Sequence, residues 1–292
     1  MSAAQFKSVG VAAHIGKPES RDRLAELLGF LDEQGVAVQL DPEAAGLIGR
    51  PQDARPLTEI RKSADLLIVL GGDGTILRVA RELGETPTPI LGVNVGSLGF
   101  LTSIRAEELR PALTEILRGD YNLSERHTLS ATIHRGGKPM ETHRALNDAV
   151  ISRSAFSRIV RLRLLLDGEL LTEYVCDGMI FATATGSTAY SLSAGGPILM
   201  PETRAFVVTP ICPHALSNRS IIAGRTGVAR CVVVSAAGEL LLTVDGQVQL
   251  RLQVGDEVDV RRSSKTVRLV TRRGHSYFEI LRQKLKWSGA NV

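Results

Sequence analysis

The chain has 292 residues, of which 43% are hydrophobic and 23% charged, and its formal net charge at pH 7 is +4. This composition excludes a disordered or fibrous chain, and the 4% of aromatic residues, with no basic stripe interleaved among them, argue against nucleic-acid binding. The apolar runs are strand-sized and residues 1–16 carry no secretory signal, so we expect a cytoplasmic protein that does not span a membrane.

The first 120 residues alternate short apolar runs with amphipathic stretches. We expect strands at residues 8–14, 36–40, 66–70 and 89–93. We expect helices at residues 19–34, after residue 75 and around residues 109–117, each with one apolar face. Because strands that alternate with helices form parallel sheets covered by helices, this half predicts an α/β domain.

From residue 121 the apolar period changes to two. Residues 161–164 alternate before an Asp167-Gly168 turn, and residues 248–254 alternate strictly. A helical pattern returns only at residues 277–287. This half therefore predicts a mostly antiparallel sandwich or distorted barrel, joined to the first half without a flexible linker.

The sequence G-G-D-G-T occupies residues 71–75, directly after a predicted buried strand. Ligands of open parallel sheets bind beyond the carboxyl ends of the strands, and a new helix offers unpaired N–H groups that favour phosphate. The G-x-G-x-x-G and G-x-x-x-x-G-K-[ST] patterns are both absent. Spacing alone leaves two interpretations open, a phosphate-binding site and a plain strand–turn–helix capped by Asp73.

Three further stretches are candidates for a site. Residues 177–191 run from a strand into a loop rich in hydroxyls, which suits sugar or phosphate oxygens but also fits an ordinary turn. Asn147-Asp148 interrupts the apolar run 145–151, either as an edge irregularity or with one side chain facing a pocket. Residues 245–247, Asp-Gly-Gln, read as a simple hairpin turn. No G-x-S-x-G elbow and no C-x-x-C or H-E-x-x-H spacing is present, so neither a serine hydrolase nor a zinc site is expected.

Taken together, these stretches resemble the NAD kinase family. The matching motifs, in the order of the family, are G-G-D-G-T at 71–75, N-x-G-x-L-G-F-L-T at 94–102, N-D at 147–148, D-G at 177–178, T-G-S-T-A-Y-S-L-S-A-G-G-P-I at 185–198, C-P-H-A-L at 212–216 and D-G-Q at 245–247. The resemblance implies an N-terminal α/β domain, a β-sandwich-like C-terminal domain and a last helix that packs back on the first domain. We therefore expect an α/β domain at 1–120 with the returning segment 272–292, and an all-β, NAD-binding domain at 121–271.

The resemblance also implies an activity. The enzyme would transfer a phosphoryl group from ATP, with a divalent metal cation such as Mg²⁺, to the 2′-hydroxyl of the adenosine ribose of NAD, which yields NADP. Asp73 would be the general base, and the surrounding glycines would let phosphate and ribose reach the backbone. Members of the family are oligomers, so a homodimer or homotetramer is expected. No protein ligand of the metal is implied.

Position by position, the resemblance assigns substrate-binding roles. Asn147 and Asp148 would hold the ribose and nicotinamide portion of NAD. Asp177 and the loop 188–193 would bind the dinucleotide, and Arg78 would meet phosphate. The full set of binding residues that the resemblance implies is Gly74, Arg78, Asn147, Asp148, Arg158, Asp177, Thr188, Ala189, Tyr190, Ser191, Leu192, Ser193 and Gln247.

Three residues depart from the pattern of the family. Ala184 stands where proline is usual, Asp148 replaces the commoner glutamate, and Val175 lies where members differ in accepting NADH. Two other functions stay open, one because the G-G-D-G loop is shared with other kinases and one because of these departures. Lipid kinases and phosphofructokinases also carry G-G-D-G loops, although they lack the motif at 185–198. A nucleotide-binding sensor without catalysis is the third possibility, against which the intact Asp73 argues.

Overall fold

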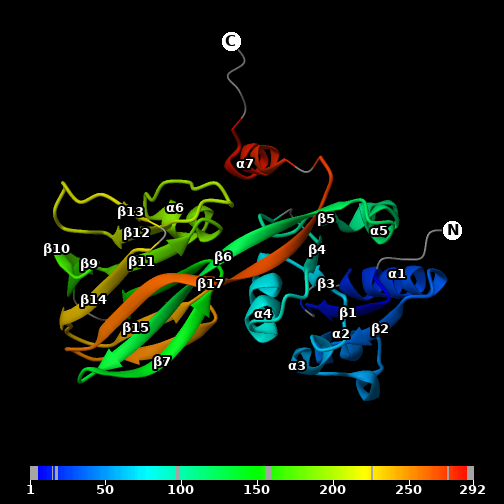
Figure 1. Ribbon diagram of the computed structural model, residues 1–292, viewed down its shortest axis with the longest axis horizontal. Helices are drawn as coiled ribbons and strands as arrows, with labels where there is room; N and C mark the ends of the chain where they lie inside the picture. The colour runs from blue at the N-terminus through cyan, green and yellow to red at the C-terminus, as the bar shows by residue number, and fades with distance from the viewer. Residues whose placement is uncertain are drawn as a thin grey trace, which may run out of the picture. The chain divides into compact units, whose positions relative to one another are not determined.

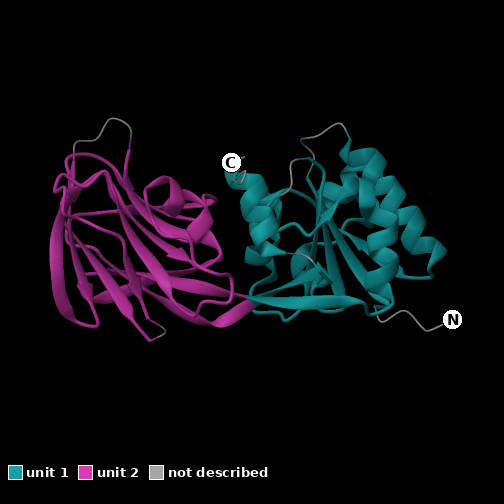
Figure 2. Cartoon of the chain, turned by 90° about the horizontal axis from the view of Figure 1, so that it is seen from above, with its two compact units in different colours: residues 1–125, 267–292 teal, residues 126–266 magenta. Residues whose placement is uncertain are grey.

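The computed structural model describes residues 6–14, 16, 19–96, 99–154, 159–224, 226–274 and 276–287. The chain divides into two compact units, shown in different colours in Figure 2: unit 1 is Met1–Glu125 with Val267–Val292, and unit 2 is Arg126–Thr266. Among the described residues, no helix is both long and apolar enough to cross a membrane.

Unit 1 is built on a parallel sheet (Figure 1). Its strands are β1 (Ser8–Ala13), β2 (Ala37–Leu40), β3 (Leu66–Gly71), β4 (Ile90–Asn94) and β5 (Ile104–Arg105). They lie in the order β5-β4-β3-β1-β2, and every neighbouring pair is parallel. The four longer strands confirm those predicted from the sequence, with each end within one residue.

The helices of unit 1 follow the strands in the predicted alternation. They are α1 (Ser20–Glu33), α2 (Pro42–Leu47), α3 (Leu57–Ile60), α4 (Asp73–Leu83), α5 (Leu109–Leu117) and α7 (Tyr277–Leu285), with 3₁₀ turns at Pro51–Asp53 and Ala106–Glu108. The sequence predicted α1, α4, α5 and α7 but missed the short helices α2 and α3.

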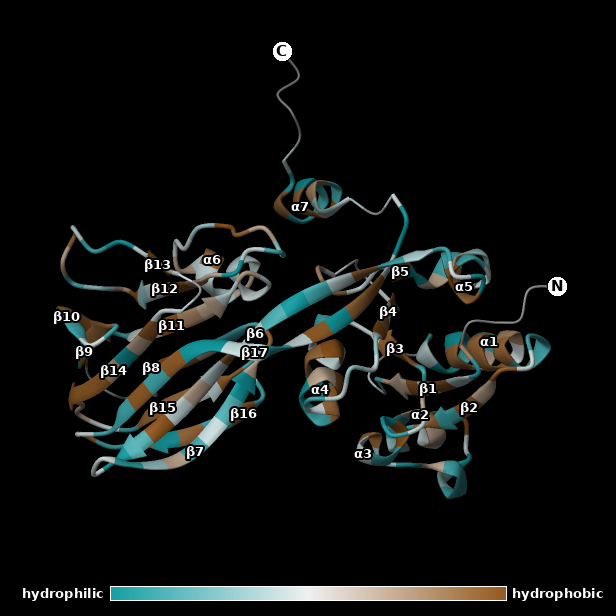
Figure 3. Cartoon of the chain, viewed as in Figure 1, coloured by the Kyte–Doolittle hydropathy of each residue, from teal (hydrophilic) through white to brown (hydrophobic). Residues whose placement is uncertain are grey.

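The central strands β3 and β4 are buried on both faces. Figure 3 shows both in the hydrophobic colour. α1 and α5 pack in one cluster with Ile68 of β3. On β1 and β4, glycines permit close packing by two other helices. A Cβ atom on Gly10 would lie 2.4 Å from Ile60 Cγ2 of α3, and one on Gly92 would lie 2.5 Å from Ile76 Cδ1 of α4. α4 is thus held tightly against the strands that flank its N-terminus.

The last helix, α7, packs on unit 1. The Tyr277 ring centroid lies 6.4 Å from that of Phe100. Gln283 Oε1 accepts a hydrogen bond from Arg105 Nη2 at 3.3 Å. These contacts confirm the expectation that the C-terminal helix returns to the first domain.

Unit 2 consists of two sheets. The first contains β6 (Tyr121–Arg135), β7 (Lys138–Ala145), β9 (Val160–Leu166), β10 (Glu169–Cys176), β14 (Val228–Ser235) and β17 (Glu257–Arg272). Of these strands, β6 begins in unit 1 and β17 ends in it. The second contains β8 (Asp148–Arg153), β11 (Gly178–Thr183), β12 (Phe206–Ile211), β13 (Ile221–Ala223), β15 (Leu240–Val244) and β16 (Val248–Leu252), in the order β13-β12-β11-β8-β15-β16. All pairs of the second sheet are antiparallel. Leu162 and Leu164 of the first sheet share one core with Ile151 and Phe181 of the second, which confirms the predicted sandwich.

Candidate active site

Asp73 is the first residue of α4, directly after the end of β3, and its side chain is partly exposed. Its carboxylate accepts two backbone hydrogen bonds, from Phe100 N to Oδ2 at 2.8 Å and from Leu101 N to Oδ1 at 3.0 Å. Both donors lie in the segment that follows the neighbouring parallel strand β4. The carboxylate is therefore fixed where the ends of two adjacent strands meet, which is the usual ligand position of such sheets. Each oxygen keeps lone-pair capacity for a further donor.

Glycine at position 99 makes this arrangement possible. A Cβ atom there would lie 1.9 Å from Asp73 Oδ1. The Gly99 amide donates to Thr102 Oγ1 at 2.9 Å, and Asn94 Nδ2 donates to the same hydroxyl at 3.3 Å. Asn94, Gly99 and Thr102 thus fix the backbone whose amides contact Asp73. All three belong to the motif at 94–102, which the sequence indicated only through the family resemblance.

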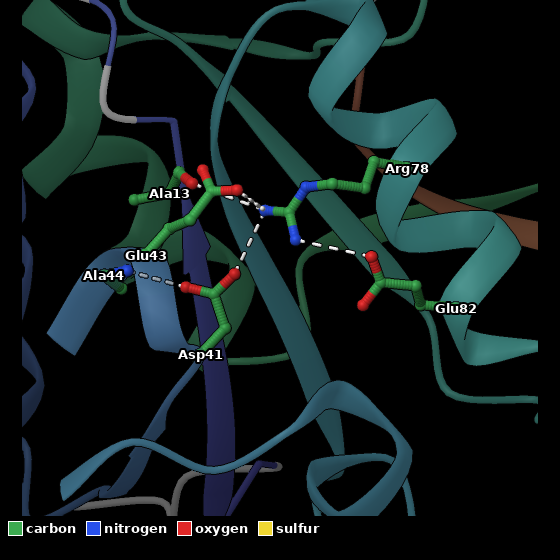
Figure 4. Close-up of polar contacts among 6 residues, drawn as sticks. All are labelled: Ala13, Asp41, Glu43, Ala44, Arg78 and Glu82. Carbon is green, nitrogen blue, oxygen red and sulfur yellow. Dashed lines mark hydrogen bonds and ion pairs between the residues drawn. The ribbon is translucent and has the colours of Figure 1, made fainter. Parts of the chain in front are cut away.

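Arg78, predicted to meet phosphate, is surrounded by carboxylates (Figure 4). Its Nη2 lies 3.0 Å from Asp41 Oδ2 and 3.7 Å from Glu43 Oε1, and its Nη1 lies 3.6 Å from Glu82 Oε1. Asp41 is fully buried and also caps α2, because its Oδ1 accepts from Ala44 N at 2.7 Å. One cation among three anions leaves a local negative charge, which disfavours phosphate. The phosphate contact of Arg78 stays a prediction, and the observed contacts tie α4 to α2.

Arg78→Ala is expected to lower the free energy of unfolding by about 2–3 kcal/mol, because it leaves the buried Asp41 carboxylate without its guanidinium partner and beside Glu43. Adding Asp41→Asn should recover part of the loss, since asparagine still caps α2 but carries no charge. Urea denaturation of the three proteins measures both effects. A raised KM for ATP with no change in unfolding free energy would instead assign Arg78 to phosphate.

In unit 2, the fold brings Asn147 and the hydroxyl-rich loop together. Thr183 N donates to Asn147 O at 2.8 Å, and Thr183 Oγ1 donates to Leu146 O at 2.7 Å. A Cβ atom on Gly186 would lie 2.1 Å from Asn147 O, so only glycine permits this approach. The candidate stretches 147–148 and 177–191, which are distant in sequence, are therefore in direct contact in the fold.

Several hydroxyls of this loop have structural partners. The Ser187 and Ser191 side chains are fully buried, Ser187 Oγ donates to Ala184 O at 2.7 Å, and Ser191 Oγ shares a hydrogen bond of 3.0 Å with Thr209 Oγ1. Tyr190, in contrast, is 46% exposed. The ligand contacts predicted for residues 188–193 stay predictions. Within this loop, the Ser191 hydroxyl already has a hydrogen-bond partner in the fold.

The other predicted residues lie in different settings. Asp177 Oδ1 accepts a hydrogen bond of 2.7 Å from Arg153 Nε, and both side chains are partly exposed. Gln247 is exposed in the turn between β15 and β16, and Gly74 is exposed in the first turn of α4. Arg158 lies outside the described residues. Asp245 is not among the site residues predicted from the sequence, where Asp-Gly-Gln at 245–247 reads as a simple turn. Its carboxylate accepts hydrogen bonds from the backbone around Asn147.

Asp148 is 6% exposed, and burial raises the pKa of its carboxyl to about 7, with the charge of Asp245 adding to the shift. Folding therefore keeps a proton on Asp148 at pH values where the unfolded chain has released it. The contribution of this carboxyl to the free energy of unfolding falls as the pH rises from about 4 towards 7.

Asp148→Asn, which replaces a protonated carboxyl by a neutral amide of similar shape, should remove this pH dependence. The difference in unfolding free energy, variant minus parent, is expected to grow in favour of the variant by about 2 kcal/mol between pH 5 and pH 7. Urea denaturation of both proteins at pH 5, 6, 7 and 8 measures it. A difference that stays constant with pH would contradict the raised pKa.

Comparison with known proteins identifies the chain. Residues 9–121 match the ATP-NAD kinase N-terminal domain, and residues 146–272 match the ATP-NAD kinase C-terminal domain. The NAD kinases of Geotalea daltonii and Geobacter metallireducens are 43% and 44% identical to it over 282 residues, 97% of this chain and 99% of each relative. The structure of yeast NADH kinase complexed with NADH aligns with a TM-score of 0.88 at 28% identity, covering 100% of this chain and 93% of the yeast chain. An NAD kinase from Archaeoglobus fulgidus in complex with ATP shares the fold, with a TM-score of 0.76 at 24% identity over 97% of this chain and 100% of that one. The chain therefore belongs to the NAD kinase family and is a kinase.

Proposed function

We propose that the enzyme transfers the γ-phosphoryl group of ATP to the 2′-hydroxyl of the adenosine ribose of NAD, with Asp73 as general base. The observation that carries this proposal is the Asp73 carboxylate, partly exposed at the start of α4 and oriented by the Phe100 and Leu101 amides. The NAD kinases among its relatives and the neighbours complexed with NADH and with ATP support the choice of substrates.

In the proposed step, the ribose oxygen attacks the γ-phosphorus of ATP. The bond from that phosphorus to the β–γ bridging oxygen breaks, ADP leaves, and the hydroxyl proton passes to Asp73. Because phosphoryl transfer has a loose transition state, the main tasks of the protein are alignment of the reactants and neutralisation of charge.

A divalent cation such as Mg²⁺ would accompany ATP and neutralise its phosphates. Among the described residues, no group of three or more His, Cys, Asp or Glu side chains is placed to hold a metal ion. We therefore name no protein ligand and derive no step through the metal. The proposed substrate contacts are Gly74, Arg78, Asn147, Asp148, Arg158, Asp177, the loop 188–193 and Gln247.

The domain limits, assembly and location are also proposals. We propose domains at 1–120 with 272–292 and at 121–271, the second carrying the NAD-binding residues, limits close to those of the two compact units. The homodimer or homotetramer and the cytoplasmic location stay predictions.

The test is NADP formation from NAD, ATP and magnesium, coupled to an NADP-specific dehydrogenase, with NADH in a parallel reaction. Calorimetric titration with NAD runs beside it. NADP formation supports the proposal. Binding of NAD without turnover would indicate a sensor, and activity on diacylglycerol or sphingosine with none on NAD would indicate a lipid kinase.

A further inference from the structure

Asp245 occupies a special position in the turn between β15 and β16. Its φ is +50° and that of Gly246 is +67°, so both lie in the left-handed region. Among non-glycine residues, aspartate and asparagine tolerate this region best. The turn itself therefore accounts for the residue type but not for what the carboxylate contacts.

The Asp245 carboxylate reaches the junction of β7 and β8. Its Oδ2 accepts from Leu146 N at 2.8 Å, and its Oδ1 accepts from Asn147 N at 2.7 Å and from Asp148 N at 3.1 Å. The Asp245 amide donates back to Asp148 O at 2.9 Å. In a regular strand, successive N–H groups point to opposite sides, so three consecutive amides that converge on one carboxylate require a bent backbone. The carboxylate stabilises that bend.

A second Asp-Gly turn in the chain provides an internal comparison. Asp167, between β9 and β10, has a φ of +53°, followed by Gly168 at +87°. Its Oδ1 accepts from Val228 N at 2.8 Å, and it lies next to none of the predicted site residues in sequence. The two turns share their conformation, but the contact with three consecutive amides belongs to Asp245.

We propose that Asp245 is a positioning residue for NAD, acting by fixing the backbone of residues 146–148. The side chains of Asn147 and Asp148 extend from this backbone, and the Asn147 carbonyl accepts the Thr183 amide that leads into the hydroxyl-rich loop. The inference rests on the proposed function, because it takes Asn147 and Asp148 to contact NAD.

The first test uses the free protein and requires no activity. Hydrogen exchange of the amides at 146–148 is measured in the parent, in Asp245→Asn and in Asp245→Gly, with Asp167→Asn as control. Both replacements tolerate the left-handed turn, but asparagine keeps one acceptor oxygen and glycine keeps none. Because hydrogen bonds to charged groups are stronger than those between neutral groups, exchange should become about tenfold faster or more in Asp245→Gly. It should rise less in Asp245→Asn and stay unchanged in Asp167→Asn. Unchanged exchange in Asp245→Gly would overturn the proposal.

The second test separates positioning from general stability. In Asp245→Gly, the KM for NAD should rise about tenfold, with the KM for ATP within about twofold of the parent and asparagine giving a partial rescue. A KM for NAD that does not change, in a variant whose amides exchange faster, would overturn the proposal. If the parent forms no NADP, the proposed function fails by itself, and the NAD dissociation constant from calorimetry replaces KM in the same comparison.

Discussion

Replacing Asp73 with asparagine is expected to lower kcat for NADP formation by about 10²–10⁴-fold, because a positioned general base contributes that much to a rate. Asparagine has nearly the shape of aspartate but cannot accept the hydroxyl proton. NAD and ATP should still bind, since their proposed contacts include many other residues. Coupled assays give kcat, and calorimetry gives the two dissociation constants.

Asparagine at position 73 would also change the hydrogen bonds that hold this side chain. Both oxygens of Asp73 accept backbone amides, Oδ2 from Phe100 and Oδ1 from Leu101. The amide nitrogen of asparagine would face one of these donors, so the unfolding free energy of the variant must be measured beside its activity. A loss in substrate affinity equal to the loss in turnover, with stability retained, would contradict the role of Asp73 as base.

The fold was predictable because its signals are local. The apolar run of β3, the three glycines at 71–74 and the apolar face of α4 lie within a few residues of one another and predicted strand, loop and helix correctly. The change of period after residue 120 likewise predicted the antiparallel sandwich. Asp41-Pro42 is an equally local signal for the N-terminus of the short helix α2, since a capping side chain is followed by proline.

The partners of the site residues were not predictable in the same way. Asp73 contacts the amides of residues 27 and 28 positions later, and Asp245 contacts amides 97 to 99 positions earlier. Backbone N–H groups are the same in nearly every residue, so no sequence pattern marks which of them a carboxylate will meet. For Arg78, the position after the glycine loop predicted a contact with phosphate. In the structure its guanidinium group instead lies beside three carboxylates that are distant or unmarked in the sequence pattern.

Gly99→Ala is expected to lower kcat by about 10²-fold, although residue 99 bears no reactive group. A Cβ atom would lie 1.9 Å from Asp73 Oδ1 and 2.6 Å from its Cγ, so the carboxylate or the loop must move. A displacement of about 1 Å at a reacting group costs on the order of 10² in rate. Alanine is expected to act here through the contact of its Cβ atom with the Asp73 carboxylate.

A matched control and a double variant decide whether this effect passes through Asp73. Gly29→Ala, in the middle of α1 with nothing within 4 Å of the added Cβ, should leave kcat unchanged and raise the unfolding free energy by about 0.5–1 kcal/mol. If Gly99→Ala acts by displacing the Asp73 carboxylate, it should cost little further activity once Asp73 is asparagine and no base is left to misplace. Fully additive losses in the double variant would show that Gly99 serves some other contact, and they would weaken the assignment of the 99–101 loop as the support of the base.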